Sequence, residues 1–391
     1  MAARDHWRIA VMPGDGVGPE VMTETVAALE ELAGLSGLRL ELEPLDWPSV
    51  AYHREHGAMM PADWRERLGA YDALLLGALG DPGPADDPNR YNLPDSVSLA
   101  PLLAIRKGFD QWACERPAHI LDGAPRFLAD PRAADTDMLV IRENSEGEYV
   151  DQGGRLAVGT DREIATQTEI FTRRGTERIF RHAFAQAQKR AAERRAGHRR
   201  DRRFPLPEGG EADSQVCLIT KRNALRFWGE MYSEVFAEVA ADYPDVATHH
   251  ELVDAACMKF VAAPWQFDVV VASNLHGDIL TDLAAVLSGG LGVAPSANIN
   301  PGDRSAPPLF EPTHGSAPDI AGRDLAGPHA MLLTAAMMLD WMGEEDPAAA
   351  AAGRRLRAAV EADLSRHGIR ERRTSEAGSS VRDLLHETGQ E

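Results

Sequence analysis

The sequence has few cysteines and no long apolar run, and both absences narrow the class of protein. Its three cysteines, Cys114, Cys217 and Cys257, include no C-x-x-C pair, which argues against a disulfide framework and a zinc knuckle. No stretch approaches the run of about eighteen apolar residues that a membrane helix needs. The N-terminus leads almost directly into a strand-like segment, which leaves no room for a signal peptide. We therefore expect a soluble protein of the reducing cytoplasm.

Basic residues are also scarce. The chain has 41 Lys and Arg against 61 Asp and Glu, a net charge of −20. This balance argues against nucleic acid and anionic membranes as main partners, and an anionic substrate would need a locally basic pocket. A length of 391 residues predicts two domains or one large α/β unit.

Strand-like and helical patterns alternate along most of the chain, which predicts an α/β fold. Residues 8–12, 21–35 and 38–47 form a strand, helix and strand pattern, and the short apolar runs at 72–80, 137–144, 216–221 and 267–274 predict further strands. Residues 144–173 are rich in threonine, glycine and alternating polarity, which favours β-hairpins that can reach a partner subunit. From Pro347 we expect a surface helix and then a short polar terminal segment.

The segment 189–213 is the one basic block of this acidic chain. One interpretation is a nucleic-acid-binding arm. We favour a helix end that continues into a solvated insertion loop, because no aromatic residues interleave with the arginines.

Three glycines, Gly14, Gly16 and Gly18, follow the first predicted strand at every second position. A dinucleotide-binding fingerprint requires the spacing G-x-G-x-x-G, so this loop fails it by one residue. Pro19 suits the first turn of the helix that follows. The loop is predicted to be a tight strand-to-helix turn, and the cofactor site is expected elsewhere.

Asp278 and Asp282 follow the strand-like segment 267–274 and lie four residues apart, so a helix would place both carboxylates on one face. Mg²⁺ and Mn²⁺ accept such hard oxygen ligands and keep positions open for substrate. The alternative for an isolated pair is a solvated acidic helix face.

Three arginines, Arg106, Arg116 and Arg142, are candidates to bind the carboxylates of a dicarboxylate, because a guanidinium binds carboxylate oxygens in pairs. Arg142 ends an apolar strand, where ligands of open parallel sheets gather. Lys221 also ends an apolar strand and is a candidate general base, and Tyr149 can supply a proton.

A loop rich in glycine and proline, residues 309–328, leaves main-chain N–H groups available for a ligand. His314 and Asp319 are its polar anchors. An acidic residue accepts a hydrogen bond from a ribose 2′-hydroxyl and repels a 2′-phosphate, so Asp319 favours NAD over NADP. Without its context, the loop is as compatible with a structural role as with a functional one.

Four segments together resemble the isocitrate and isopropylmalate dehydrogenase family, the metal-dependent β-decarboxylating dehydrogenases: "MPGDGVGPEV", "RENSEGEY", "ASNLHGDILTDL" and "EPTHGSAPDIAG". Other segments are most similar to its tartrate and D-malate dehydrogenase branch. The resemblance implies a two-domain, non-Rossmann α/β fold with a large mixed sheet and a β-arm for dimerisation. It places the cofactor domain at 1–111 and 289–391 and the substrate, metal and dimerisation domain at 112–288.

The resemblance also implies roles for individual residues. Arg106, Arg116 and Arg142 would bind the substrate, and Lys221 and Tyr149 would be catalytic. Asp278 and Asp282 would bind Mn²⁺ or Mg²⁺ together with Asp254 of the neighbouring chain, and Lys221 would cross the same boundary, so that a homodimer shares its active sites. NAD would be held by Glu311, His314, Gly315, Ser316, Ala317, Asp319 and Ile320, and a monovalent cation such as K⁺ is compatible with this family.

The predicted function is NAD-dependent oxidation and β-decarboxylation of a small 2-hydroxy dicarboxylic acid such as tartrate or D-malate, without nucleic acid or membrane as partner. The alternatives are a 3-isopropylmalate dehydrogenase and a catalytically silent regulatory subunit on the same fold. The sequence departs from the family pattern at Gly327, where asparagine is usual, and at His276, where an aromatic residue is usual.

Overall fold

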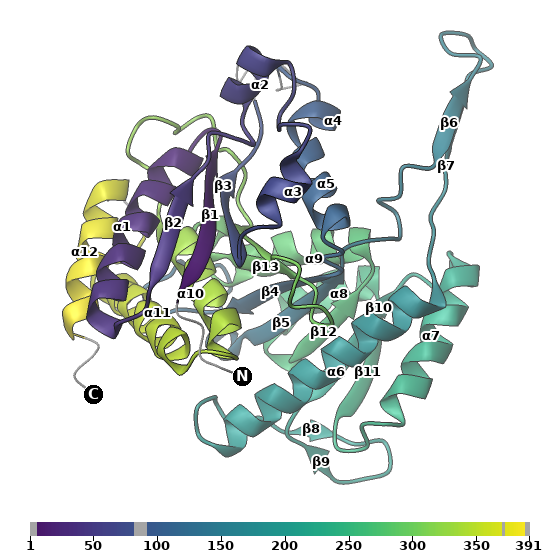
Figure 1. The fold of residues 1–391 in the computed structure, drawn as a ribbon. Helices are drawn as coiled ribbons and strands as arrows, with labels where there is room; N and C mark the ends of the chain where they lie inside the picture. Colours follow the sequence, from purple (N-terminus) through teal and green to yellow (C-terminus); the bar gives the residue numbers. More distant parts are fainter. Residues whose placement is uncertain (1–5, 82–91, 370–371, 388–391) are drawn as a thin grey trace. The chain divides into compact units, whose positions relative to one another are not determined.

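The computed structural model describes residues 6–81, 92–369 and 372–387, and it contains two compact units (Figure 1). The first unit comprises 1–111, 116–129 and 285–391, and the second comprises 112–115 and 130–284. Ten strands belong to a large mixed sheet, which confirms the predicted α/β class. No helix in the described part of the chain is long and apolar enough to cross a membrane. The assignment of cofactor and substrate to separate domains stays a prediction.

The first unit contains five sheet strands in the order β13-β14-β3-β1-β2. β13 and β14 are antiparallel, whereas β14, β3, β1 and β2 are parallel. All residues of β3 are buried, as expected for a parallel strand covered on both faces. The bounds are β1 (Trp7–Gly14), β2 (Leu40–Pro44), β3 (Ala73–Ala78), β13 (Pro295–Ile299) and β14 (Leu309–Pro312).

Helices cover this part of the sheet, and α10 packs against α1, α11, β13 and β14. The helix predicted from Pro347 is present as α11, but the expected polar terminal segment is wrong: the chain forms a further helix, α12, which packs on α1 and α11. Val381 and Leu385 of α12 are fully buried, and this apolar face stabilises a helix that looks polar overall. The helices are α1 (Gly18–Ser36), α2 (Val50–His56), α3 (Trp64–Leu68), α4 (Asp95–Ser98), α5 (Ala100–Gly108), α10 (His329–Gly343), α11 (Pro347–His367) and α12 (Thr374–Glu387).

The second unit contains four parallel strands in the order β11-β10-β12-β5. Helix α6 packs across β5, β10 and β12, and α7 packs on α6 and β10 (Figure 1). β4 (Ala113–His119) has residues in both units. The other bounds are β5 (Asp137–Glu143), β10 (Gln215–Thr220), β11 (Ala247–Leu252), β12 (Val269–Ala272), α6 (Arg173–Arg195), α7 (Arg226–Ala240), α8 (Val253–Ala262) and α9 (Asn274–Leu287), with short 3₁₀ turns at Pro131–Asp135, Pro264–Gln266 and Leu291–Val293.

The predicted hairpin arm is present. β6 (Gly153–Leu156) and β7 (Ile164–Gln167) pair antiparallel and extend away from the rest of the second unit (Figure 1). All eight strand residues are exposed, including Leu156 and Ile164. A hairpin with apolar side chains on both strands and no core of its own is typical of an element that packs against another chain.

The basic block begins as the predicted helix end, and most residues from 195 to 211 are exposed, as expected of a solvated loop. Two features differ from the prediction. Arg190 and Arg194, on the last turns of α6, are buried and both bind the carboxylate of Asp268. The chain then forms a small hairpin from β8 (Phe204–Pro205) and β9 (Glu211–Ala212). The burial was not predicted because arginine is normally exposed, and only the tertiary structure supplies a buried carboxylate as its partner.

Candidate active site

A cluster of polar side chains lies at the carboxyl ends of β5 and β12. The two strands are parallel neighbours, with Arg142 of β5 opposite Ala272 of β12, and β12 leads into α9. Ligands of open parallel sheets gather at such strand ends. This edge therefore brings Arg142 next to the first turns of α9, although 130 residues separate them.

Arg142 is almost fully buried and is held by α9. Its Nε and Nη2 donate to Oδ1 of Asn274 at 3.0 and 2.6 Å, and its Nη1 donates to Asp278. Gly277 makes this approach possible, because a Cβ there would lie 2.7 Å from Cβ of Arg142. The sequence analysis gave Asn274 no role, although it lies within the "ASNLHGD" segment.

Tyr149 completes the cluster. Its hydroxyl donates to Oδ2 of Asp278 at 2.8 Å, and the Arg142 guanidinium lies 5.0 Å from its ring centre. Burial raises the pKa of Tyr149, and the charge of Asp278 raises it further. A phenol that stays protonated is suited to the predicted role of proton donor.

The three aspartates predicted to bind metal are not brought together in one chain. Asp278 and Asp282 lie one turn apart on α9, whereas Asp254 lies on the first turn of α8. Among the described residues, no group of three or more His, Cys, Asp or Glu side chains is arranged to hold a metal. Lys221 donates to Asp254 at 2.8 Å, and this hydrogen bond lowers the pKa of that carboxyl. The two residues predicted to reach a neighbouring chain are thus paired with each other.

Two of the predicted substrate arginines lie in the first unit. Arg106, on α5, is buried and its Nη2 donates to Oε1 of Glu311 on β14 at 2.6 Å. Asn298 donates to the same oxygen at 2.8 Å. Glu311, predicted to bind the cofactor, is therefore the direct partner of an arginine predicted to bind substrate. Arg116 is buried on β4.

The glycine-rich turn after β1 packs directly on the predicted cofactor loop. The N–H of Val17 donates to the carbonyl of Ser316 at 2.9 Å, and a Cβ on Gly16 would lie 1.9 Å from that oxygen. Gly14 and Gly16 also have left-handed backbone conformations, with φ of 71° and 60°. Gly16 therefore allows the close packing of the two loops, and the left-handed glycines form the tight strand-to-helix turn that was predicted.

Other hydrogen bonds hold the rest of the predicted cofactor loop in place. The Glu20 carboxylate on α1 accepts from the N–H groups of Gly322 and Asp324. Nδ1 of His314 donates to the Gly315 carbonyl oxygen at 3.1 Å, and burial lowers the pKa of His314. Nε2 of His314 is buried without a hydrogen-bond partner among the described residues, and Asp319 is exposed. Gly315, Ala317 and Ile320 lie on the same loop.

Comparison with known proteins identifies the family. Residues 8–199 and 207–381 match the family described as isocitrate/isopropylmalate dehydrogenase. The chain belongs to this family. Membership confirms the resemblance and the prediction of an oxidoreductase that acts on a CH–OH group. Residues 200–206 of the basic block are left out of the match.

Relatives in the isocitrate/isopropylmalate dehydrogenase family are similar to this chain over most of its length. It is 41% identical over 362 residues to the D-malate dehydrogenase (decarboxylating) of Escherichia coli (strain K12). This alignment covers 92% of each chain. It is 42% identical to the tartrate dehydrogenase/decarboxylase of Pseudomonas putida, over 87% of this chain and 86% of that one. The 3-isopropylmalate dehydrogenase of Thermobifida fusca (strain YX) is 38% identical over 98% of each chain.

A solved structure supports the same fold. The crystal structure of isocitrate dehydrogenase from Methylococcus capsulatus matches with a TM-score of 0.74 and 29% identity, covering 97% of this chain and 99% of that one. The predicted two-domain isopropylmalate-dehydrogenase-like fold is thereby confirmed.

Proposed function

We propose that the protein oxidises and decarboxylates a 2-hydroxy dicarboxylate such as D-malate or tartrate, using NAD and Mn²⁺ or Mg²⁺. The observation that carries this proposal is the contact of Arg142 and Tyr149 with Asp278 at the end of β5. It brings a carboxylate-binding cation, a proton donor and a metal-binding acid to one place. The names of relatives that share 41–42% of the sequence support the substrate class.

The residues present fit a divalent metal. Asp278 and Asp282 offer hard oxygen ligands from one helix face, and Asp254 is an exposed carboxylate that pairs with Lys221. Arg142 binds Asp278 in this structure. If a substrate carboxylate replaced Asp278 as the partner of Arg142, Asp278 would become available to the metal. Substrate and metal would then bind together.

A metal at these aspartates would make the substrate hydroxyl more acidic, and NAD would accept hydride. Lys221 accepts the hydroxyl proton as hydride leaves C2. Departure of the carboxylate β to the new ketone then gives CO₂ and an enolate. Tyr149 donates a proton to the enolate carbon, which its raised pKa allows because the phenol remains protonated.

The protein would act as a homodimer with shared sites. Helices α8 and α9 expose apolar side chains at Met258, Val261, Leu275 and Ile279. Asp278 and Asp282 follow Leu275 and Ile279 by three residues each, so the metal-binding carboxylates adjoin this apolar face. Together with the exposed β6–β7 arm, the face is suited to pack against a second copy, which would bring Lys221 and Asp254 to the partner's Asp278.

Complementation tests the shared site. Lys221→Met and Asp278→Asn should each be inactive as homodimers. After mixing, denaturation and refolding, a heterodimer has one site with both natural residues, so activity should return. Activity that stays absent, with heterodimers present by mass spectrometry, would contradict the shared site.

A substrate panel tests the reaction itself. D-malate, the tartrate isomers, isopropylmalate and isocitrate are each incubated with NAD and Mn²⁺, and NADH is followed by absorbance at neutral pH. We expect turnover of D-malate or tartrate, with release of CO₂. If isopropylmalate alone reacts, the alternative substrate is correct. If the folded protein forms no NADH with any of these substrates, the regulatory-subunit alternative is favoured.

Cofactor choice has a separate test. Asp319 is exposed on the proposed NAD loop, and Asp319→Lys should shift preference towards NADP by replacing repulsion with attraction for a 2′-phosphate. An unchanged preference for NAD over NADP would contradict the assignment of Asp319 to the ribose. We further propose a cytoplasmic location, since all three cysteines are free.

A further inference from the structure

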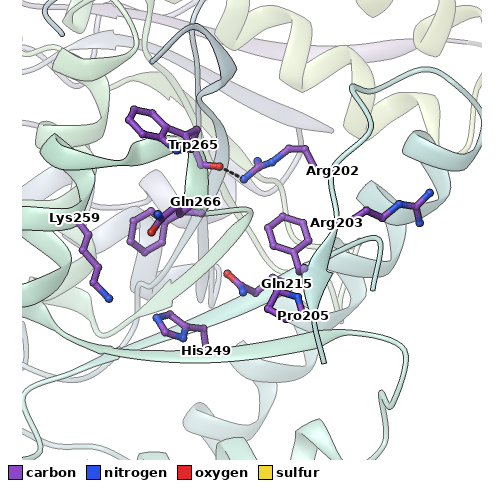
Figure 2. Close-up of a pocket in the computed structure, with 10 residues that line it drawn as sticks. Arg202, Arg203, Pro205, Gln215, His249, Lys259, Trp265 and Gln266 are labelled. Carbon is purple, nitrogen blue, oxygen red and sulfur yellow. Dashed lines mark hydrogen bonds between the residues drawn. The ribbon is translucent and has the colours of Figure 1, made fainter. Parts of the chain in front are cut away.

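A cavity of about 460 Å³ lies in the second unit where the β8–β9 hairpin meets β10, β11 and α8 (Figure 2). Its size is that of a small-molecule site. One wall comes from Arg202 to Pro205, which overlap the segment 200–206 that the family match leaves out. Four of the ten lining residues therefore come from a segment outside the family match.

The lining is basic in an otherwise acidic protein. None of the ten lining residues is Asp or Glu, whereas Arg202, Arg203, Lys259 and His249 are among them. Figure 2 shows Lys259 and His249 on one side of the cavity and Arg202 on the other, with the side chain of Arg203 turned outward. Cationic groups on two sides favour an anionic occupant over a neutral one.

Arg202 is the cation best placed to accept an anion. Its Nη1 donates to the carbonyl of Asp137 at 2.9 Å, and its Nη2 donates to the carbonyl of Trp265. These partners carry no full charge. Burial lowers the pKa of Arg202 to about 10, and the nearby charges of Asp268 and Arg194 act on it in opposite directions.

Three aromatic residues, Phe204, Trp265 and Phe267, are among those that line the cavity. The Arg202 guanidinium lies 5.0 Å from the Phe204 ring centre. A flat apolar body gains contact area against such rings, whereas a bare inorganic anion does not. The combination of cations and rings matches a ligand with a charged end and an apolar ring.

We propose that this cavity binds a small aromatic anion, with its carboxylate or phosphate group at Arg202 and Lys259 and its ring against the aromatic lining residues. Lys259 reaches the ligand by exchanging its present partner, Glu251. Glu251 keeps His249 as a second partner, so the exchange leaves no buried carboxylate unpaired.

Calorimetric titration of the full-length protein with phenyl phosphate tests the proposal. We expect one saturable site per chain. Inorganic phosphate, which lacks the ring, and benzyl alcohol, which lacks the charge, should each bind at least about tenfold more weakly. Benzoate, compared with phenyl phosphate, distinguishes a carboxylate ligand from a phosphate ligand. Absence of saturable binding by both aromatic anions, or inorganic phosphate that binds as tightly, overturns the proposal.

Variants place the binding in this cavity. Lys259→Gln and Arg202→Gln should each weaken phenyl phosphate by about tenfold. The matched control is Arg200→Gln, which removes an arginine of the same block that binds Asp135 and does not line the cavity. Lys259 is 43% exposed, so its variant keeps the test valid if Arg202→Gln unfolds. Equal weakening by all three variants, or none by Lys259→Gln, contradicts the assignment.

Discussion

The two ends of β12 carry two aspartates that both bind arginine, yet the surroundings of these aspartates differ. Asp268 precedes the strand and is fully buried. It accepts from Nε of Arg190 at 2.6 Å, from both terminal nitrogens of Arg194 at 2.9 and 2.7 Å, and from the N–H of Gln215 at 3.2 Å. Asp278 follows the strand, remains 34% exposed, and accepts from Arg142 and Tyr149.

The difference separates a structural carboxylate from a candidate catalytic one. Burial alone would raise the pKa of Asp268, but the charges of Arg190 and Arg194 hold it below its ordinary value. Its oxygens are saturated by protein donors, so no ligand is needed there. Asp278 keeps access to solvent and therefore to a metal and substrate. The carboxyl end of the strand, rather than an arginine contact as such, marks the site.

The largest expected effect is the loss of activity in Asp278→Asn. The amide keeps the shape of the side chain but loses the charge that would bind metal, and metal polarisation is worth several kcal/mol. We expect kcat/KM to fall by about 10³-fold. NADH formation with D-malate and Mn²⁺ measures it, and the melting temperature should stay near that of the natural protein.

Asp268→Asn should lower the stability of the protein and leave substrate binding unchanged, the opposite of Asp278→Asn. It leaves Arg194 buried without its carboxylate partner and Arg190 with Asp137 alone, and we expect the free energy of unfolding to fall by about 3 kcal/mol. Urea unfolding followed by tryptophan fluorescence gives this value. KM of the folded variant should not change; a raised KM with unchanged stability would reverse the comparison of the two aspartates.

Tyr149→Phe tests the catalytic role of the residues around Asp278. Loss of the proton donor should lower kcat by about 10²-fold with little change in stability. Because burial and Asp278 raise the pKa of Tyr149 above its ordinary value near 10, activity that depends on its proton is lost only as pH rises beyond that value. A pH profile of kcat for the natural enzyme should therefore show no loss from Tyr149 between about pH 7 and 9.

The smallest expected effect concerns Asp363 in the first unit. It tests whether a second buried aspartate with basic partners stabilises the fold as Asp268 does. Asp363 is buried and accepts from His329 at 2.8 Å and from Arg372 at 2.7 and 3.0 Å. Burial alone would raise its pKa, but the hydrogen bonds from His329 and Arg372 lower it well below the ordinary value. Asp363→Asn should cost about 2 kcal/mol at neutral pH.

The sign of the pH dependence follows from that lowered pKa. The stabilisation is complete above the unfolded value near 3.9 and is lost as pH falls through the folded value. The difference in stability between the natural protein and Asp363→Asn should therefore be constant from about pH 6 to 8 and shrink below about pH 4. Unfolding curves at several pH values measure it, and a difference that grows in acid would contradict the ion pairing.

Much of the fold was predictable because its signals are local. Buried strands such as β3, β5 and β12 are short apolar runs, and α1 begins near Pro19 after a glycine turn. Asp278 and Asp282 also lie on one helix, as their spacing indicated. By contrast, α12 was missed because its packing partners, α1 and α11, are other helices of the fold. The burial of Arg190 and Arg194 was missed because their partner, Asp268, is distant in sequence.

The sequence by itself determined the α/β class, the family and the candidate residues, because periodicity and motif spacing are properties of contiguous chain. Only the tertiary structure decided that Arg142 binds Asn274 and Asp278, that Gly16 packs on Ser316, and that the basic block lines a cavity. These contacts join residues far apart in sequence. Their free energy depends on burial and on which charges become neighbours, and folding alone establishes both.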